Sequence, residues 1–207
     1  MSMAHPTQIS KSIQLLVEGK DQLNFFEAFI RRVELQNELQ VQDFGGVNEL
    51  RGFLLALVDA PGFDTVVSVG IVRDAEESAT GAHRSVENSL RNAGLPAPGD
   101  ANGGDGPAVQ VLILPGGEEE RGMLETLLCR SVVDEPVNDC INGFLECADA
   151  LPGIDIRKPH KTRAHAYLAT QPEPQVSVGV AALKGYWPLD HEAFAGVRTF
   201  LTALSAS

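Results

Sequence analysis

The stretch "IQLLVEGKDQLNFF", residues 13–26, contains the turn on which the fold depends. Its apolar run, Ile13 to Val17, stops at Glu18, and a glycine and two more charged residues follow directly. An amphipathic helical pattern then begins at Asp21, with apolar residues spaced three and four apart. A strand that only fills a core has no need of a glutamate at its exit, whereas a ligand site at the end of that strand does.

Strand and helix patterns alternate through the first half of the chain. The expected strands are 12–18, 38–46, 64–72 and 109–117, and the expected helices begin near 21, 50 and 81. This alternation predicts an α/β fold with a doubly wound, mainly parallel sheet and helices on both faces. Because such sheets bind ligands at the carboxyl ends of their strands, Glu18 stands where a ligand would bind.

The pattern changes after residue 117. Helical spacing recurs at 123–128, 137–148 and 189–204, and another short segment opens at Pro159. We therefore expect a core at residues 1–117 and a mostly helical C-terminal extension at 118–207 that carries a basic segment.

Composition bounds the classes of function. The chain has 207 residues, 43% of them apolar, and a formal net charge of −12, which argues against gripping nucleic acid through overall charge but leaves a local basic patch open. No apolar run approaches membrane-spanning length. An odd number of cysteines favours a reducing cytoplasm over a disulfide framework, and we interpret Cys129, Cys140 and Cys147 as small buried apolar residues.

Three carboxylates follow strands of the expected sheet. Asp74 and Glu76 lie two positions apart after one strand, so extended geometry points them the same way, and Glu18 ends another strand. If these strands are neighbours, the acids converge and repel one another unless a cation lies among them, and oxygen ligands suit Mg²⁺. The alternative is that all three are solvated loop acids of an acidic protein.

The basic segment "IRKPHKTRAH" is the candidate phosphate-binding patch. Arg157, Lys158, Lys161 and Arg163 are four of the 16 Lys and Arg in the chain. A helix starting at Pro159 would direct Lys161 and Arg163 to different faces. The alternative interpretation is a solvated basic turn.

Several motifs resemble a known family. "LLVEGKDQ", followed at a distance by "VGIVRDAEES", resembles the Toprim domain over residues 12–117. "VQDFGGVNELRGFL", "ILPGGEEERGMLETLL" and "KTRAHAYLA" are similar to a group close to the nucleases of the "overcoming lysogenisation defect" (OLD) family. The resemblance implies a Toprim-like sheet and metal-dependent nuclease chemistry.

The resemblance assigns roles to the strand-end acids. Glu18 matches the family's glutamate, which is a general acid/base or metal ligand, and Asp74 matches the first aspartate of its metal-binding pair. Glu76 stands where the second aspartate would be, so its carboxylate reaches one methylene farther.

The resemblance also assigns residues outside the strand ends. Lys161 matches the lysine that stabilises the transition state. Asp21 could serve as a further metal ligand, but the neutral Gln22 fills the next position, which argues against a complete second metal site. Glu125 could lean from its helix toward the site, although such glutamates are more often exposed.

Two classes of function follow, with a third behind them. The first is a Mg²⁺- or Mn²⁺-dependent phosphodiester hydrolase that acts on nucleic acid, with DNA as the expected substrate. The resemblance also implies a separate ATPase partner, because the chain has no Walker A motif of its own. The second is a non-catalytic Toprim-like module that binds a metal or nucleotide and regulates a partner. A receiver-like phosphoacceptor ranks last, because no acidic pair follows the first strand.

Overall fold

A four-stranded parallel sheet forms the centre of the protein. The computed structural model describes residues 5–99, 106–117 and 120–206. The strands are β1 (Ile13–Val17), β2 (Leu39–Asp43), β3 (Ser68–Asp74) and β4 (Ala108–Leu114), in the order β2-β1-β3-β4. The predicted α/β class with a parallel, doubly wound sheet is confirmed.

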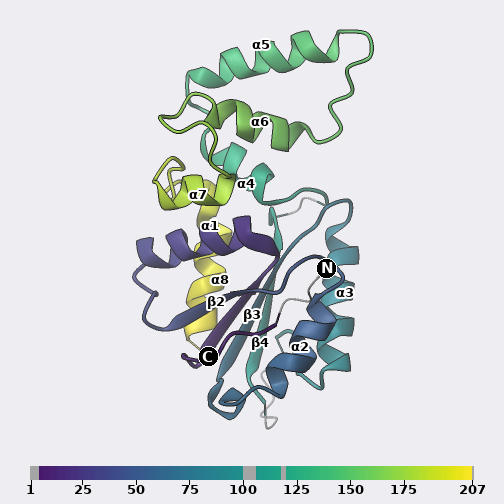
Figure 1. The fold of residues 1–207 in the computed structure, drawn as a ribbon, viewed down its shortest axis with the longest axis vertical. Helices are drawn as coiled ribbons and strands as arrows, with labels where there is room; N and C mark the ends of the chain where they lie inside the picture. The colour runs from purple at the N-terminus through teal and green to yellow at the C-terminus, as the bar shows by residue number, and fades with distance from the viewer. Residues whose placement is uncertain (1–4, 100–105, 118–119, 207) are drawn as a thin grey trace.

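Helices cover both faces of this sheet (Figure 1). One face packs against α1 (Gly19–Arg32) and α8 (Ala195–Ser205), and the other against α2 (Leu50–Val58) and α3 (Ala79–Asn92). Strand β3 shows the alternation that this requires: Val69 and Ile71 belong to the core under α2 and α3, whereas Val72 belongs to the core under α1 and α8. No helix among the described residues combines the length and apolarity needed to cross a bilayer.

The C-terminal extension is mostly helical, as predicted. Its helices α4 (Leu124–Ser131), α5 (Val137–Asp149), α6 (Pro159–Leu168) and α7 (Val178–Leu183) stack beyond the carboxyl ends of the strands (Figure 1). Helix α8 then returns to the sheet, and Leu201 and Leu204 share one core with Leu15 of β1. The division after residue 117 stays a prediction, because residues on both sides of it contribute to this core.

One expected strand boundary was wrong, and one short helix was not anticipated. The third strand begins at Ser68 rather than near residue 64, because Phe63–Thr65 form a 3₁₀ turn. Gly62 starts that turn with φ of 92°, and its carbonyl accepts hydrogen bonds from the Thr65 amide and hydroxyl. Helix α7 was not anticipated, since its six residues are too short to show a helical period.

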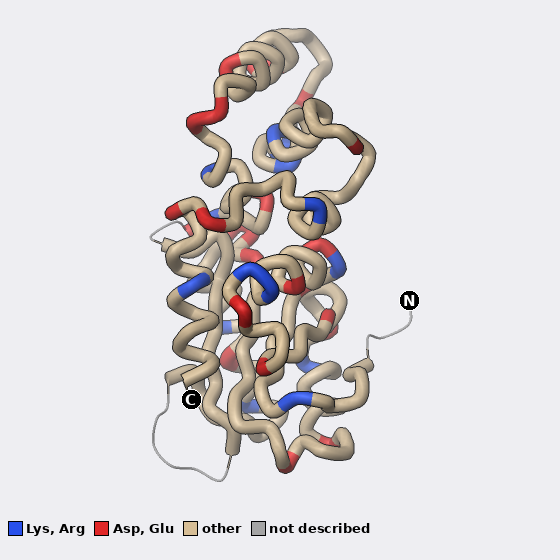
Figure 2. The backbone as a smooth tube through the Cα atoms, turned by 90° about the vertical axis from the view of Figure 1, so that its left-hand side faces the viewer, with Lys and Arg blue, Asp and Glu red and all other residues tan. Residues whose placement is uncertain are grey.

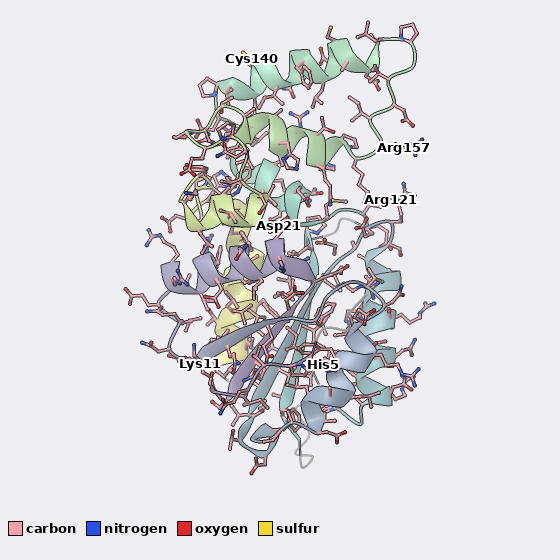
Figure 3. All side chains as sticks on the ribbon, in the orientation of Figure 1. His5, Lys11, Asp21, Arg121, Cys140 and Arg157 are labelled. Carbon is pink, nitrogen blue, oxygen red and sulfur yellow. The ribbon has the colours of Figure 1, made fainter. Side chains whose placement is uncertain are left out.

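The cysteines divide between the core and the surface. Cys129 is buried, as interpreted from the sequence, but Cys140 and Cys147 are exposed. Helix α5 is the outermost element, and Cys140 lies on it (Figures 1 and 3). The interpretation was wrong for these two residues because α5 buries only Asn138 and Ile141 against the rest of the protein.

The packing of α8 on the sheet predicts the effect of a methyl group at Gly70. A Cβ there would lie 2.6 Å from Leu204 Cδ2 and 3.1 Å from Phe200 Cζ. We expect Gly70→Ala to lower the unfolding free energy by about 1–3 kcal/mol, because the side chains of α8 must shift. Thermal or urea unfolding would measure the change.

Gly52→Ala is the matched control for Gly70→Ala. Gly52 lies in α2, and a Cβ there would meet no atom within 4 Å. We expect this variant to gain about 0.5–1 kcal/mol of stability, as alanine does inside a helix. Equal stability changes in the two variants would contradict the packing of α8 described above.

Candidate functional site

The ends of two neighbouring strands bring Glu18 and Asp74 together. Strands β1 and β3 pair in parallel, with Leu16 opposite Ile71, so both strands end at the same edge of the sheet. Glu18 follows β1 directly, and Asp74 is the last residue of β3. The predicted placement of these two acids at the ends of adjacent strands is therefore confirmed.

Asp74 is the most perturbed group of this edge. Its Oδ1 accepts hydrogen bonds from Gln22 Nε2 at 2.9 Å and from the Leu124 amide at 3.0 Å. Burial, followed by the charges of Glu18 and Glu125, nevertheless raises the pKa of Asp74 to about 8. Without a cation nearby, this carboxyl is therefore largely protonated at neutral pH.

Glu18 occupies a similar position with fewer partners. Burial raises the pKa of Glu18, and the positive charge of Arg73 partly opposes that shift. The Arg73 Nε lies 3.8 Å from Glu18 Oε2, which is too far for a hydrogen bond. Among the described residues, no hydrogen bond reaches Glu18 Oε2 or the Nε and Nη1 of Arg73. Sequence reasoning missed Arg73, because it lies within an otherwise apolar strand.

Glu76 reaches the site by a different route from the one expected. Its φ is 50°, so the strand does not continue through it, and the expectation that Asp74 and Glu76 point the same way from extended backbone was wrong. Glu76 instead forms an isolated antiparallel bridge with Gly122. Its carboxylate lies 3.4 Å from Lys158 Nζ, and its charge still contributes to the raised pKa of Asp74.

Glu125 and Lys161 complete the cluster from the extension. Glu125 lies in the first turn of α4 and is only 7% exposed. It is therefore buried beside the site, although a glutamate in such a sequence is more often exposed. Lys161, on α6, places its Nζ 3.4 Å from Glu125 Oε1. Lys161, which the sequence predicts to be catalytic, therefore pairs with Glu125, whose charge raises the pKa of Asp74.

Two further aspartates near the strand ends hold the backbone. Asp21 Oδ1 accepts a hydrogen bond from the Gly179 amide at 3.0 Å, so Asp21 ties the start of α1 to α7 (Figure 3). Asp43, which sequence reasoning missed, ends β2, and its Oδ1 accepts from the Gly19 amide at 2.8 Å and the Gly45 amide at 2.7 Å. Asp43 ends a strand just as Asp74 does, and this position in the sequence could have identified it as a candidate.

The side chains of the basic segment interact with different partners in the structure. Arg157 Nε donates to Asp155 at 2.9 Å, and Arg163 Nη1 donates to Asn142 Oδ1 on α5. Lys158 and Lys161 turn instead toward Glu76 and Glu125. Figure 2 shows that basic and acidic positions are interspersed along the described backbone.

The carboxylate oxygens of this cluster are suitable ligands for a hard divalent cation, but their spacing in the structure does not form a coordination site. Glu18, Asp74, Glu76 and Glu125 supply carboxylate oxygens, and Glu18 Oε2 is buried without a hydrogen-bond partner in the described structure. As they lie, no three His, Cys, Asp or Glu side chains within residues 5–99, 106–117 and 120–206 form a cation-binding group. Binding would therefore require these side chains to draw together.

The raised pKa of Asp74 predicts how the stability of the metal-free protein depends on pH. The folded chain keeps a proton on Asp74 up to about pH 8, whereas the unfolded chain releases it near 4. Because the folded state then binds more protons, the unfolding free energy should fall as pH rises between these values, by at most about 1.4 kcal/mol per unit.

Asp74→Asn tests this pH dependence. Asparagine Oδ1 can still accept the hydrogen bonds from Gln22 and the Leu124 amide, but it carries no charge at any pH. We expect the variant to be more stable than wild type at pH 8 in EDTA, and the difference to vanish toward pH 4. Urea unfolding across this range would measure it, and parallel pH profiles would contradict the assigned pKa.

Comparison with known proteins places the chain in a family. The family model described as "Protein of unknown function (DUF3226)" matches residues 12–206. No curated protein matches the chain. Among solved structures, the C-terminal region of the OLD protein of Xanthomonas campestris pv. campestris is similar, with 16% identity and a TM-score of 0.35 over 89% of this chain and 93% of that chain. The family match spans nearly the whole sequence, and the chain therefore belongs to the DUF3226 family of proteins of unknown function.

Proposed function

We propose that this protein is a Mg²⁺- or Mn²⁺-dependent phosphodiester hydrolase that acts on nucleic acid. The observation that carries the proposal is the environment of Asp74, whose pKa is raised to about 8 by burial and by the charges of Glu18, Glu125 and Glu76. An enclosed group of carboxylates that repel one another is costly in a metal-free chain and is relieved by a bound cation.

The carboxylates would hold the cation through oxygen atoms of Glu18, Asp74, Glu76 and Glu125. A divalent cation bound there would act as a Lewis acid that activates water and stabilises the leaving oxygen. Asp21 is a weaker candidate ligand, because its Oδ1 already accepts the Gly179 amide.

Two residues would act on protons and charge. Glu18 Oε2 has no hydrogen-bond partner among the described residues and has a raised pKa, which suits an atom that accepts a proton from water. Lys161 Nζ, 3.4 Å from Glu125, would lie beside the phosphoryl group and offset the negative charge that develops on it.

The sequence motifs support the same proposal. "LLVEGKDQ" and "VGIVRDAEES" place Glu18, Asp74 and Glu76 in the order that Toprim domains use, and "KTRAHAYLA" places Lys161 as OLD-type nucleases do. The resemblance also suggests a separate ATPase partner, since the chain itself has no Walker A motif.

A non-catalytic metal- or nucleotide-binding module is the second candidate. Two observations favour it: Gln22 and the Leu124 amide already engage Asp74 Oδ1, and Glu76 is held by Lys158. Such a module would bind the cation at the same carboxylates without cleaving a phosphodiester. Metal binding without cleavage of DNA or RNA would favour this candidate.

The first prediction of the proposal concerns metal binding. We expect Mg²⁺ and Mn²⁺ to bind wild type and to raise its unfolding temperature, with affinity that weakens as pH falls and the carboxylates take up protons. Asp74→Asn should lose most of this affinity, because a charged ligand is replaced by a neutral amide. Calorimetry would measure both proteins, and equal affinities would reject the site.

The second prediction concerns cleavage. Lys161→Ala should lower the rate of Mg²⁺- or Mn²⁺-dependent cleavage on the order of a hundredfold, and lower affinity for the nucleic acid much less, since a transition-state contact is lost. Arg163→Ala is the matched control, because Arg163 donates to Asn142 and lies outside the carboxylate cluster. Assays on single- and double-stranded DNA and on RNA would compare them. Equal rates in the two variants would remove Lys161 from the mechanism.

A further inference from the structure

A cleft opens beside the carboxylate cluster. It has a volume of about 340 Å³ and lies between the segment that follows β3, the residues before α4 and the start of α6. Its lining includes Glu76, Glu77, Arg121, Arg157 and Lys158. Figure 3 shows Arg121 and Arg157 on the same side of the molecule, one above the other. The cleft therefore combines three cationic side chains with Glu76, one of the proposed metal ligands.

The cations of this cleft are balanced by acids in the metal-free structure. Arg121 Nη1 lies 3.6 Å from Glu77 Oε2, and Lys158 Nζ lies 3.4 Å from Glu76 Oε2. Arg157 pairs with Asp155, as described above. Because each cation faces a carboxylate, these three pairs give the cleft no net positive charge with which to attract an anion.

All three pairs are exposed enough to exchange partners. The side chains of Lys158 and Glu76 are 52% and 42% exposed, and those of the two arginine pairs are more exposed still. Ion pairs at such positions are worth about 0–1 kcal/mol. A phosphate that accepts charge-assisted hydrogen bonds from arginine and lysine can therefore replace the carboxylates at small cost.

Glu76 connects the cleft to the metal site. A cation that takes Glu76 as a ligand removes the partner of Lys158 and adds two positive charges next to the cleft. Both effects leave the cleft with an excess of positive charge. Lys158 would then be available to an anion at the same moment as the carboxylate site is filled.

We infer that this cleft binds a backbone phosphate of nucleic acid next to the carboxylate site, and that divalent cation binding enables it by releasing Lys158 from Glu76. The inference rests on the metal site and substrate class of the proposed function, and it adds Arg121 to the substrate-binding residues. Because coupling between two ligands is reciprocal, bound nucleic acid also raises the affinity for the cation.

The test is the binding of a fluorescein-labelled oligonucleotide, followed by anisotropy with Mg²⁺ and with EDTA at equal ionic strength. Gel electrophoresis after each titration shows whether the oligonucleotide has been cleaved, and affinities are taken only while it is intact. Mg²⁺ ordinarily weakens protein–nucleic acid binding by competing for phosphates, so a gain in affinity is diagnostic. We expect Mg²⁺ to raise the affinity of wild type about fivefold or more.

Two variants separate the inferred exchange from other effects of the cation. Glu76→Gln should bind the oligonucleotide in EDTA more tightly than wild type does in EDTA, because Lys158 is free. Lys158→Ala should bind like wild type in EDTA and gain clearly less from Mg²⁺ than wild type does, because only the charge of the cation remains. If Lys158→Ala keeps the full gain, the cation bridges the phosphate directly and the inference is overturned.

A second ion pair supplies the matched control. Lys184 Nζ lies 2.6 Å from Glu173 Oε1, with side chains 34% and 47% exposed, in another part of the extension. Glu173→Gln and Lys184→Ala make the same changes of charge, and both should respond to Mg²⁺ as wild type does. If Glu173→Gln and Glu76→Gln raise the affinity for the oligonucleotide in EDTA equally, the change in overall charge explains the effect and the inference is overturned.

Arg121→Ala tests the cleft itself. We expect weaker binding in Mg²⁺ and a salt dependence that is flatter by about one unit of slope, as for the loss of one phosphate contact. Unchanged affinity and slope would place the nucleic acid elsewhere. Cleavage is scored separately: cleavage without the Mg²⁺-dependent gain overturns this inference alone, whereas the gain without cleavage overturns only the hydrolase.

Discussion

The enclosure of several carboxylates at one edge of a parallel sheet is the constraint around which this structure is arranged. Parallel strands end side by side, so acids placed after β1 and β3 must meet. Burial removes the water that would separate their charges, and the hydrogen bonds that Asp74 Oδ1 accepts from described residues come from neutral donors, Gln22 and the Leu124 amide. The metal-free chain therefore balances this edge with a bound proton on Asp74, with Lys158 just before α6 and with Lys161 in its first turn.

The acids near this edge divide into two groups with different functions in the fold. Asp21 and Asp43 accept hydrogen bonds from backbone amides, and through them they fix α7 against α1 and the turns that follow β1 and β2. Gly179 approaches Asp21 so closely that a Cβ would lie 2.3 Å from its carbonyl oxygen. Asp21 and Asp43 therefore stabilise the backbone around the site, whereas the carboxylates of Glu18 and Asp74 repel one another within it.

The sequence predicted the parts of the site that depend on regular structure. Strand–helix alternation was enough to place Glu18 and Asp74 at one edge of the sheet, because parallel strands end at a common edge, whereas the strand order itself makes β1 and β3 neighbours. It could not predict the geometry of Glu76, whose φ of 50° depends on a bridge to Gly122 far along the chain. The contact between Asp21 and Gly179 spans 158 residues, and no local pattern encodes it.

The two lysines that balance the carboxylates differ in a way that bears on their functions. Glu76 is 42% exposed, so water screens its pair with Lys158 and the pair can open with little loss of energy. Glu125 is 9% exposed as a side chain, so leaving it without a counter-charge costs more. Lys161 is therefore the more firmly positioned of the two, which suits the transition-state role proposed for it, and the weaker pair of Lys158 suits the exchange of a carboxylate for a phosphate that we infer.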